Sequence, residues 1–514
     1  MEMRSRTENS LRNIRVTLLF QASSFGIAFF TRKIFVQMLT QEYLGLDGTF
    51  SNILSMLSLT ELGIGSAITY SLYKPLAEKD QGQIVALMAL FRRVYWTIGG
   101  IVALFGCALT PFLPVLVRDL PDIPHIDWIY LFFVLNSSLS YFYAYKQSLM
   151  IADQRQYITT ACHFILSSLL RLAQMAFLWL SGDYFIYLGL QIGTTLLENL
   201  ILSQITDRLY PYIRRDRHGS VAPETKREII KNTKALMLHR AGGIVVFGTD
   251  NLLISIFVGV VEVGVYSNYL MVINALGSLS YRVFYSLTAS VGNLKVSSEA
   301  KHILSVFQRA NFAGNWLYGF STVCLTVLLG PFIELWLGRD YLFSRGTVCL
   351  ILMNFYVTGM RQVTLIFRDA CGLYRYEGYK PVWESVINLV VSAILAVPFG
   401  VTGIFAGTFI STMTTCFWVE PVVLFRYGLH ADVGIYFKDY IYHTLVTLLT
   451  TAAVWQICVQ LPGAGLPLFL TKMAVCAVLG NLGYLLAYCR REELRFFVAL
   501  FIRMTASIRR GNTR

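Results

Sequence analysis

Apolar stretches of roughly 20 residues recur along almost the whole of this chain, and a helix of that length can cross about 30 Å of hydrocarbon. Of its 514 residues, 55% are hydrophobic and only 14% are charged. In a soluble protein roughly a quarter of the residues are charged. The pattern therefore predicts an all-α polytopic membrane protein.

Hydropathy predicts fourteen transmembrane helices. They cover residues 16–39, 44–72, 94–117, 127–151, 158–181, 184–206, 236–259, 263–291, 311–337, 346–372, 381–400, 403–425, 440–459 and 466–488. No secretory signal is apparent, because the N-terminal segment is polar and basic and the first apolar run is too long for a signal peptide.

Loop charges predict that both termini are cytoplasmic. Nearly all lysines and arginines outside the spans fall on the side of the two termini, and the opposite loops hold only Arg118, Arg339 and Arg345. Positively charged loops remain on the cytoplasmic side of a membrane. The net charge of +13 is therefore mainly a topology signal, with membrane lipids rather than nucleic acid as the expected partner.

The first twelve spans form one six-span pattern that occurs twice. Arg32 precedes Asp250 by 218 positions, and Lys146 precedes Arg368 by 222. Because each copy has an even number of spans, both enter the membrane in the same direction, as parallel repeats do. We expect two parallel six-helix bundles around a central cavity, followed by two C-terminal helices.

This interpretation predicts five regions. They are an N-terminal six-helix bundle at 1–206, a basic cytoplasmic linker at 207–235, a C-terminal six-helix bundle at 236–425, two additional transmembrane helices at 440–488 and a basic cytoplasmic tail at 489–514.

Many charged residues fall inside the predicted spans. The basic ones are Arg32, Lys33, Lys146, Arg171, Arg240, Arg282, Arg361, Arg368 and Lys472; the acidic ones include Glu61, Glu198, Asp250, Glu334, Glu384 and Glu420. An ionised side chain at the bilayer centre costs about 2.5–3.5 kcal/mol, so each must reach an interface, pair or face water. Snorkelling to the interface is the expected role for Arg240 and Lys472.

Two groups of these residues are candidates for lining the cavity. The basic group, which would bind an anionic cargo, consists of Arg32, Lys33, Arg282, Lys146 and Arg368. Snorkelling remains an alternative for the last two. The acidic group, which would couple transport to an ion or form salt bridges in the cavity, consists of Asp250, Glu61 and Glu384.

Motifs for catalysis or cofactor binding are missing. The nine cysteines mostly lie inside apolar runs, without the spacing of a disulfide framework or a metal site. No Walker A motif is present, and the longest outward loop, about 118–126, is short. We expect a protein that is not an enzyme and that needs no cofactor or metal.

Short motifs follow one another in order along most of residues 16–425. They are Glu42-Tyr43-Leu44-Gly45-Leu46, Glu61-Leu62-Gly63-Ile64-Gly65-Ser66-Ala67, Thr249-Asp250-Asn251, Val265-Tyr266-Ser267-Asn268-Tyr269, Trp336-Leu337-Gly338-Arg339-Asp340-Tyr341, Asn388-Leu389 with Ser392, Gly407-Thr408 and Glu420-Pro421. In order and register they resemble the Wzx-type polysaccharide flippases of the multidrug/oligosaccharidyl-lipid/polysaccharide (MOP) exporter superfamily.

The resemblance implies a flippase of the bacterial plasma membrane that moves undecaprenyl-diphosphate-linked oligosaccharide repeat units to the outer leaflet for cell-surface polysaccharide biosynthesis. The implied partners are this lipid-linked glycan and a polysaccharide polymerase or assembly machinery. Arg32 suits the diphosphate because its planar fork binds phosphate oxygens in pairs, whereas Arg282 matches no family motif. A lipid II flippase, a MATE-like multidrug or metabolite antiporter and a membrane enzyme are the alternatives. Among the cavity candidates, the five basic residues against three acidic ones favour an anionic cargo.

Overall fold

The computed structural model describes residues 23–57, 64–118, 120–215, 249–285, 291, 300–499 and 502. Within these ranges the regular secondary structure is helical and no strand is present. The chain divides into two compact units, Met1–Val265 and Tyr266–Arg514. The predicted all-α polytopic membrane fold is confirmed, whereas the five predicted regions and the cavity between the bundles stay predictions.

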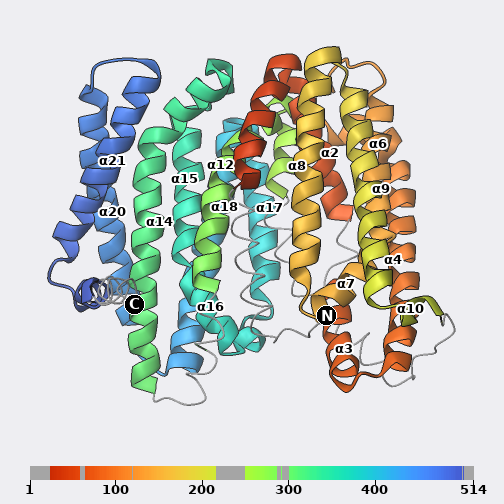
Figure 1. Ribbon diagram of the computed structural model, residues 1–514. Helices are drawn as coiled ribbons and strands as arrows, with labels where there is room; N and C mark the ends of the chain where they lie inside the picture. The colour runs from red at the N-terminus through yellow and green to blue at the C-terminus, as the bar shows by residue number, and fades with distance from the viewer. Residues whose placement is uncertain are drawn as a thin grey trace, which may run out of the picture. The chain divides into compact units, whose positions relative to one another are not determined.

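The first unit is a bundle of long helices. Its described helices are 23–38, α2 (Gln41–Leu57), α3 (Ile64–Glu78), α4 (Gln81–Leu109) extended by η2 (Thr110–Phe112) and α5 (Leu113–Leu116), α6 (Ile126–Tyr141), α7 (Ala144–Ala152), α8 (Gln156–Ser181), α9 (Tyr184–Leu209), α10 (Tyr212–Arg215), 249–257 and the start of α12 (Val260–Tyr285). Figure 1 shows α4, α6 and α9 packed side by side.

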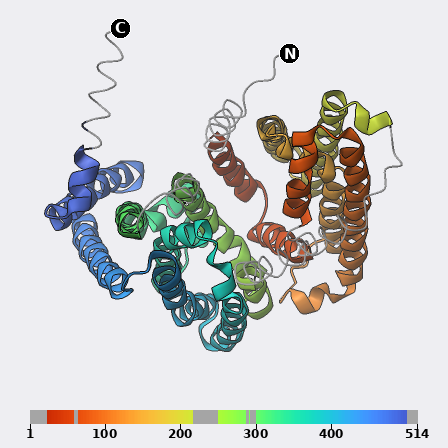
Figure 2. The same cartoon turned by 90° about the horizontal axis from the view of Figure 1, so that it is seen from below.

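The second unit continues α12 and adds the remaining helices. These are α14 (Ala300–Leu337), η3 (Arg339–Tyr341), α15 (Arg345–Met360), α16 (Gln362–Ala370), η4 (Leu373–Glu377), α17 (Lys380–Phe399), α18 (Val401–Thr414), α19 (Cys416–Val423), η5 (Leu424–Leu429), α20 (Gly434–Gln460), α21 (Gly465–Tyr488) and the helix 492–499. Figure 2 shows the same helices seen end-on.

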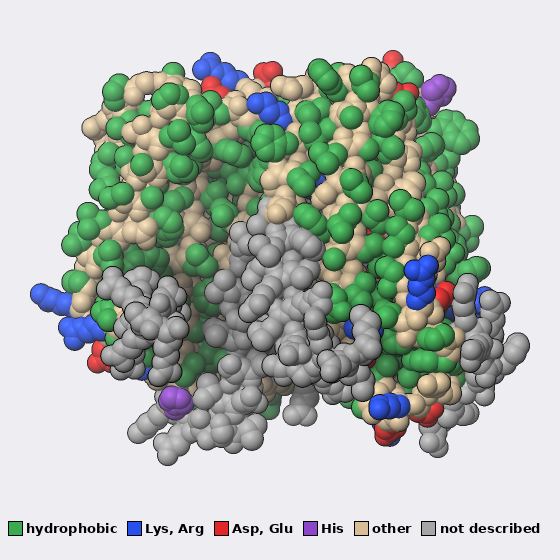
Figure 3. Space-filling model, in the orientation of Figure 1, with side chains coloured by type: hydrophobic (Ala, Val, Ile, Leu, Met, Phe, Trp, Pro, Cys, Tyr) green, Lys and Arg blue, Asp and Glu red, His purple; other side chains and the backbone are tan. Residues whose placement is uncertain are grey.

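Ten helical stretches in the described ranges are long and apolar enough to cross a membrane. The other four predicted spans, 16–39, 44–72, 127–151 and 236–259, are mostly helical where they are described, with a turn at 142–143 and an end of the helix at 257. Large apolar side chains on the helices are exposed, as Trp179 (73%) and Leu449 (71%) illustrate. In Figure 3 hydrophobic side chains cover much of the visible helix flanks, and most charged side chains lie near helix ends. Such surfaces require lipid around them.

Short connections join successive spans. Gly182 adopts the left-handed conformation (φ 64°) that ends α8, and Asp183 then caps α9 by accepting a bond from the Phe185 amide at 2.7 Å. Glycine tolerates this conformation and aspartate satisfies the unpaired amides of the first helical turn. Two residues therefore suffice to reverse the chain between α8 and α9.

Glycine contacts hold the start of α12 against α2. A Cβ on Gly45 would lie 2.0 Å from the carbonyl oxygen of Val260, and one on Gly264 would lie 2.8 Å from the Gly45 amide nitrogen. Nearby, the Arg118 guanidinium donates to the carbonyl of Phe257. The helix 249–257 and the first turns of α12 therefore pack within the first unit, although by sequence they begin the second repeat.

The two repeats share a break in their fourth span. In the first repeat, α6 gives way to α7 at residues 142–143, and in the second, α15 gives way to α16 at Arg361. The breaks are 218 to 219 positions apart, which is the spacing of the sequence repeat. Breaks within a helix redirect side chains and occur often at functional sites.

The last two helices pack on α14. Phe312, Val323, Val454, Tyr484 and Tyr488 belong to one buried cluster formed by α14, α20 and α21. Hydrogen bonds reinforce it: the indole of Trp316 donates to Asn481 at 3.1 Å, and the hydroxyls of Thr447 and Tyr484 lie 2.7 Å apart. The helices that lack a counterpart in the first repeat are thus firmly attached to the second unit (Figure 1).

Candidate functional site

The first candidate site is a polar cluster inside the first unit, formed by Arg32, Asp47, Arg171, Tyr184 and Tyr187 and called here the arginine cluster. Arg32 lies on the helix 23–38 and is half-buried, whereas the next residue, Lys33, is exposed. Adjacent residues point about 100° apart on a helix, so only one of the two faces the cluster.

Asp47 brings a carboxylate from α2 to this cluster. The Tyr184 hydroxyl donates to Asp47 Oδ1 at 3.4 Å, and Asp47 interacts electrostatically with Arg32. Asp47 was not among the predicted site residues, because it lies near the outer end of the predicted 44–72 span and no motif singles it out. Its partner in the structure is 137 positions away in sequence.

Aromatic rings form one wall of the arginine cluster. Tyr184 and Tyr187 of α9 stack with centroids 5.6 Å apart, and Phe35 contacts both rings at 5.9 and 5.4 Å. Tyr43 meets Tyr184 edge-on at 5.0 Å. The two tyrosines place hydroxyl groups beside the charged side chains in an otherwise apolar layer of helices.

Arg171 of α8 completes the cluster. Its Nη1 donates to the backbone carbonyl of Ser24 at 2.9 Å, and its charge acts on Arg32 and Tyr187. The sequence marked Arg171 as an arginine within a span but gave no reason to group it with Arg32. The grouping depends on the packing of α8 against the helix 23–38.

Lys146 and Arg368, which occupy matching positions in the two repeats, each form ion pairs with carboxylates. Lys146 Nζ lies 2.6 Å from Asp207 Oδ1 and 2.7 Å from Ser203 Oγ. Arg368 donates to Glu377 and to Asp369, in both cases at 2.7 Å. Both basic side chains are buried. Their predicted contact with cargo stays a prediction, and the observed pairing gives each a structural role.

A buried ionic network lies in the second unit. Arg361 donates to both carboxylate oxygens of Glu420, at 2.9 and 2.7 Å, and Lys380 contacts Glu420 and also Glu377, the latter at 3.2 Å. Glu384, a predicted coupling residue, is buried and lies 4.0 Å from Arg361. The network joins the break after α15 to α17, α19 and η4.

The other predicted site residues are less fully described. Asp250 lies on the helix 249–257 and is buried at 8% exposure. Arg282 lies on α12, but its side chain is outside what the structure describes, and so is the whole of Glu61. Across the described chain, no group of three or more His, Cys, Asp or Glu side chains is arranged to hold a metal ion.

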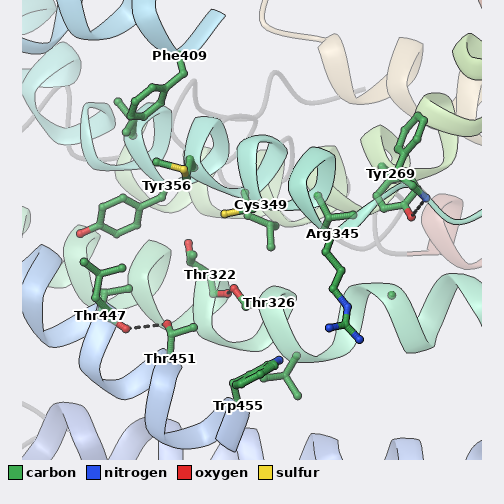
Figure 4. A pocket seen from close by; sticks show the side chains of 18 of the residues that line it. Tyr269, Thr322, Thr326, Arg345, Cys349, Tyr356, Phe409, Thr447, Thr451 and Trp455 are labelled. Carbon is green, nitrogen blue, oxygen red and sulfur yellow. Dashed lines mark hydrogen bonds between the residues drawn. The ribbon is translucent and has the colours of Figure 1, made fainter. Parts of the chain in front are cut away.

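A cavity of about 780 Å³ lies within the second unit, among α14, α15, α18, α19, α20 and α21. Its walls are mostly apolar, with hydroxyls from residues such as Thr326 and Thr451. Figure 4 shows Arg345 extending into the cavity near Trp455, while Tyr356 lies at the other end. The volume is typical of sites for small molecules or lipid chains.

Comparison with solved structures identifies the fold of this chain. The inward closed conformation of the lipid II flippase MurJ matches with a TM-score of 0.65 and 12% identity, covering 92% of this chain and 98% of that one. An inward-facing multidrug resistance transporter of the MATE family matches at 0.56 and 11% identity, over 80% of this chain and 98% of that one. A mutant of the Vibrio cholerae MATE transporter VcmN matches at 0.53 and 13%, over 82% and 99%. The chain has the fold of the MOP superfamily.

No protein-family model matches the sequence, and no curated protein matches it significantly. At 11–13% identity the likeness establishes the MOP fold alone. The fold agrees with the resemblance that the sequence motifs indicate, and the narrower Wzx-type assignment stays a prediction.

Proposed function

We propose that this MOP-fold protein is a flippase that moves polyprenyl-diphosphate-linked oligosaccharide units from the cytoplasmic to the outer leaflet of a bacterial plasma membrane. A diphosphate and several sugars cannot cross hydrocarbon unaided, because unpaired charged and polar groups lose many kcal/mol of hydration. A polar site between helices removes that barrier for the head group while the polyprenyl chain stays among lipids.

The observation that carries the proposal is Arg32 within the arginine cluster. An arginine deep in a span, beside a second arginine and two tyrosine hydroxyls, is suited to an anionic head group. Guanidinium groups bind phosphate oxygens through paired, charge-assisted hydrogen bonds. A typical MATE cargo is instead a cation and would favour a site dominated by carboxylates.

The remaining predicted site residues receive supporting roles in this proposal. Lys33, Arg282, Lys146 and Arg368 extend the basic path, and Asp250, Glu61 and Glu384 couple the cycle to an ion or form salt bridges. The two repeats rock between inward-open and outward-open states, as parallel-repeat transporters do. A polysaccharide polymerase or assembly machinery would receive the translocated unit.

Lipid II is the second candidate cargo, because the structure of the lipid II flippase MurJ covers 92% of this chain. Both cargoes present a diphosphate on a polyprenyl chain and differ in the attached sugars and peptide. The arginine cluster would bind both diphosphates in the same way, so any preference must come from the attached sugars and peptide. A competition assay between the two lipids identifies the preferred head group.

The test uses the purified protein in liposomes that contain a fluorescent polyprenyl-diphosphate oligosaccharide, with leaflet accessibility as the readout. We expect Arg32→Ala and Asp250→Ala to reduce translocation at least tenfold at equal incorporation, because each removes a charge within the membrane. Arg93→Ala, which removes an exposed arginine of α4, is the matched control and should translocate normally. Unchanged translocation by the Arg32 variant would remove this residue from the mechanism.

A further inference from the structure

Arg171 is a cation near the middle of a membrane-spanning helix whose charge the described part of the protein does not neutralise. α8 runs from Gln156 to Ser181, so Arg171 is several turns from either end. Its hydrogen bond within the described residues goes to a neutral carbonyl, that of Ser24, at 2.9 Å. A guanidinium carries five N–H donors, so most of its donors remain for another ligand.

The charged groups near Arg171 favour the binding of an anion beside it. The guanidinium of Arg32, which has the same charge, is close enough to Arg171 to repel it, and His163 is a further titratable neighbour. Asp47 interacts with Arg32, and Glu198, the carboxylate of α9, lies 3.1 Å from the ring of His163. Two arginines thus lie near each other in a layer of low dielectric constant, where repulsion between like charges is strong.

Packing fixes the two arginines on facing helices. The Thr31 hydroxyl contacts the sulfur of Met175 at 3.4 Å, which holds the helix 23–38 beside α8. Buried Gln174 donates to the Tyr187 carbonyl at 3.1 Å and holds α8 beside α9. Each contact is made by a residue close in sequence to Arg32, Arg171 or Tyr187.

We infer that Arg171 and Arg32 together bind the diphosphate of the cargo, with Tyr187 between them as a hydroxyl contact. This inference rests on the proposed function for the identity of the cargo and adds Arg171, which is not among the predicted cavity residues. Tyr187 stacks on Tyr184, whose hydroxyl donates to Asp47, and its backbone carbonyl accepts from Gln174, three positions after Arg171. Arg171 and Arg32 each supply a fork to one phosphate group, so the site distinguishes a diphosphate from a monophosphate.

The test measures binding of farnesyl diphosphate and farnesyl monophosphate to the purified full-length protein in nanodiscs. We expect the wild type to prefer the diphosphate by roughly tenfold or more, because the second phosphate gains a charge-assisted contact. Arg171→Gln and Arg32→Gln should each lower diphosphate affinity by about tenfold and bring the two affinities close together. Arg93→Gln should keep the wild-type preference.

A second variant separates binding from folding. Arg171→Lys keeps the positive charge and a donor for the Ser24 carbonyl but loses the fork, so we expect intermediate diphosphate affinity with normal thermal stability. If Arg171→Gln retains the wild-type preference for diphosphate, the inference is wrong. It is equally wrong if both Arg171 variants weaken the two ligands to the same extent, because that pattern indicates a structural role.

The binding assay contains no glycan and no transport step, so its outcome is independent of the proposed function. A preference for diphosphate that depends on Arg171, in a protein that translocates no lipid-linked oligosaccharide, would support this site and contradict the flippase proposal. Translocation that is unaffected in Arg171→Gln, together with an unchanged diphosphate preference, would support the flippase and overturn this site.

Discussion

Buried charged residues stabilise the second unit only when they pair with one another. Glu420 is completely buried, at 0% exposure, and it forms ion pairs with Arg361 and Lys380 from two other segments of the chain. Removing an ion from water costs several kcal/mol, which a bidentate pair with good geometry largely offsets. Loss of one partner leaves the other charges buried and uncompensated.

We therefore predict that Glu420→Gln lowers the free energy of unfolding by about 3–5 kcal/mol, as loss of one partner of a buried pair typically does. The matched control is Glu334→Gln, which breaks the exposed pair of Glu334 with Arg339 and should cost about 1 kcal/mol or less. Thermal unfolding in detergent measures both variants. Equal shifts for the two would show that the Arg361 network contributes no more than a surface pair.

At the scale of the helix, the glycine contacts between α2 and α12 determine how closely these helices approach. The backbone of Gly264 lies against Gly45, and Val260 and Val263 beside them are buried. Small residues at such crossings allow backbones to touch, and membrane helices associate largely through this kind of packing.

We predict that Gly264→Ala destabilises the protein, because the added methyl group would lie 2.8 Å from the Gly45 amide nitrogen and would force the helices apart. An overpacked contact costs about 1–3 kcal/mol. Gly277→Ala on the same helix is the control: nothing lies within 4 Å of its added Cβ, so alanine should be neutral or slightly stabilising. Thermal unfolding of both variants decides the matter, and a neutral Gly264→Ala would contradict the close contact.

Helices were predictable here to the extent that a local signal specifies them. Runs of apolar residues located the spans because crossing a bilayer requires continuous hydrophobicity, as in α8 and α21. No local sequence signal marked the helix break at Arg361, because hydropathy is averaged over a whole span and does not resolve a single turn. The arginine cluster was only half predictable. Depth in the span and the repeat match with Asp250 marked Arg32, but the approach of Asp47 and Arg171 depends on packing between helices far apart in sequence.

At the scale of the whole molecule, loop charges predict the orientation in the membrane. In the predicted topology, basic residues outside the spans lie almost entirely on the side that carries both termini. We predict that green fluorescent protein fused after Arg514 fluoresces, because this reporter folds in the cytoplasm. Alkaline phosphatase fused at the same place should be inactive, because this enzyme becomes active only outside the cytoplasm. The same fusions placed in the 118–126 loop are the control and should give the opposite result. Active phosphatase at the C-terminus would reverse the proposed direction of transport.

The proposed mechanism requires that a membrane protein of MOP fold binds a phosphorylated lipid through the half-buried arginines of the arginine cluster. The most direct test compares two fluorescent lipids in the same proteoliposomes: a polyprenyl-diphosphate oligosaccharide, and the same oligosaccharide joined to a polyprenol without phosphate. The predicted result is rapid protein-dependent translocation of the first lipid and background translocation of the second. Equal translocation of both lipids, or of neither, would contradict the account.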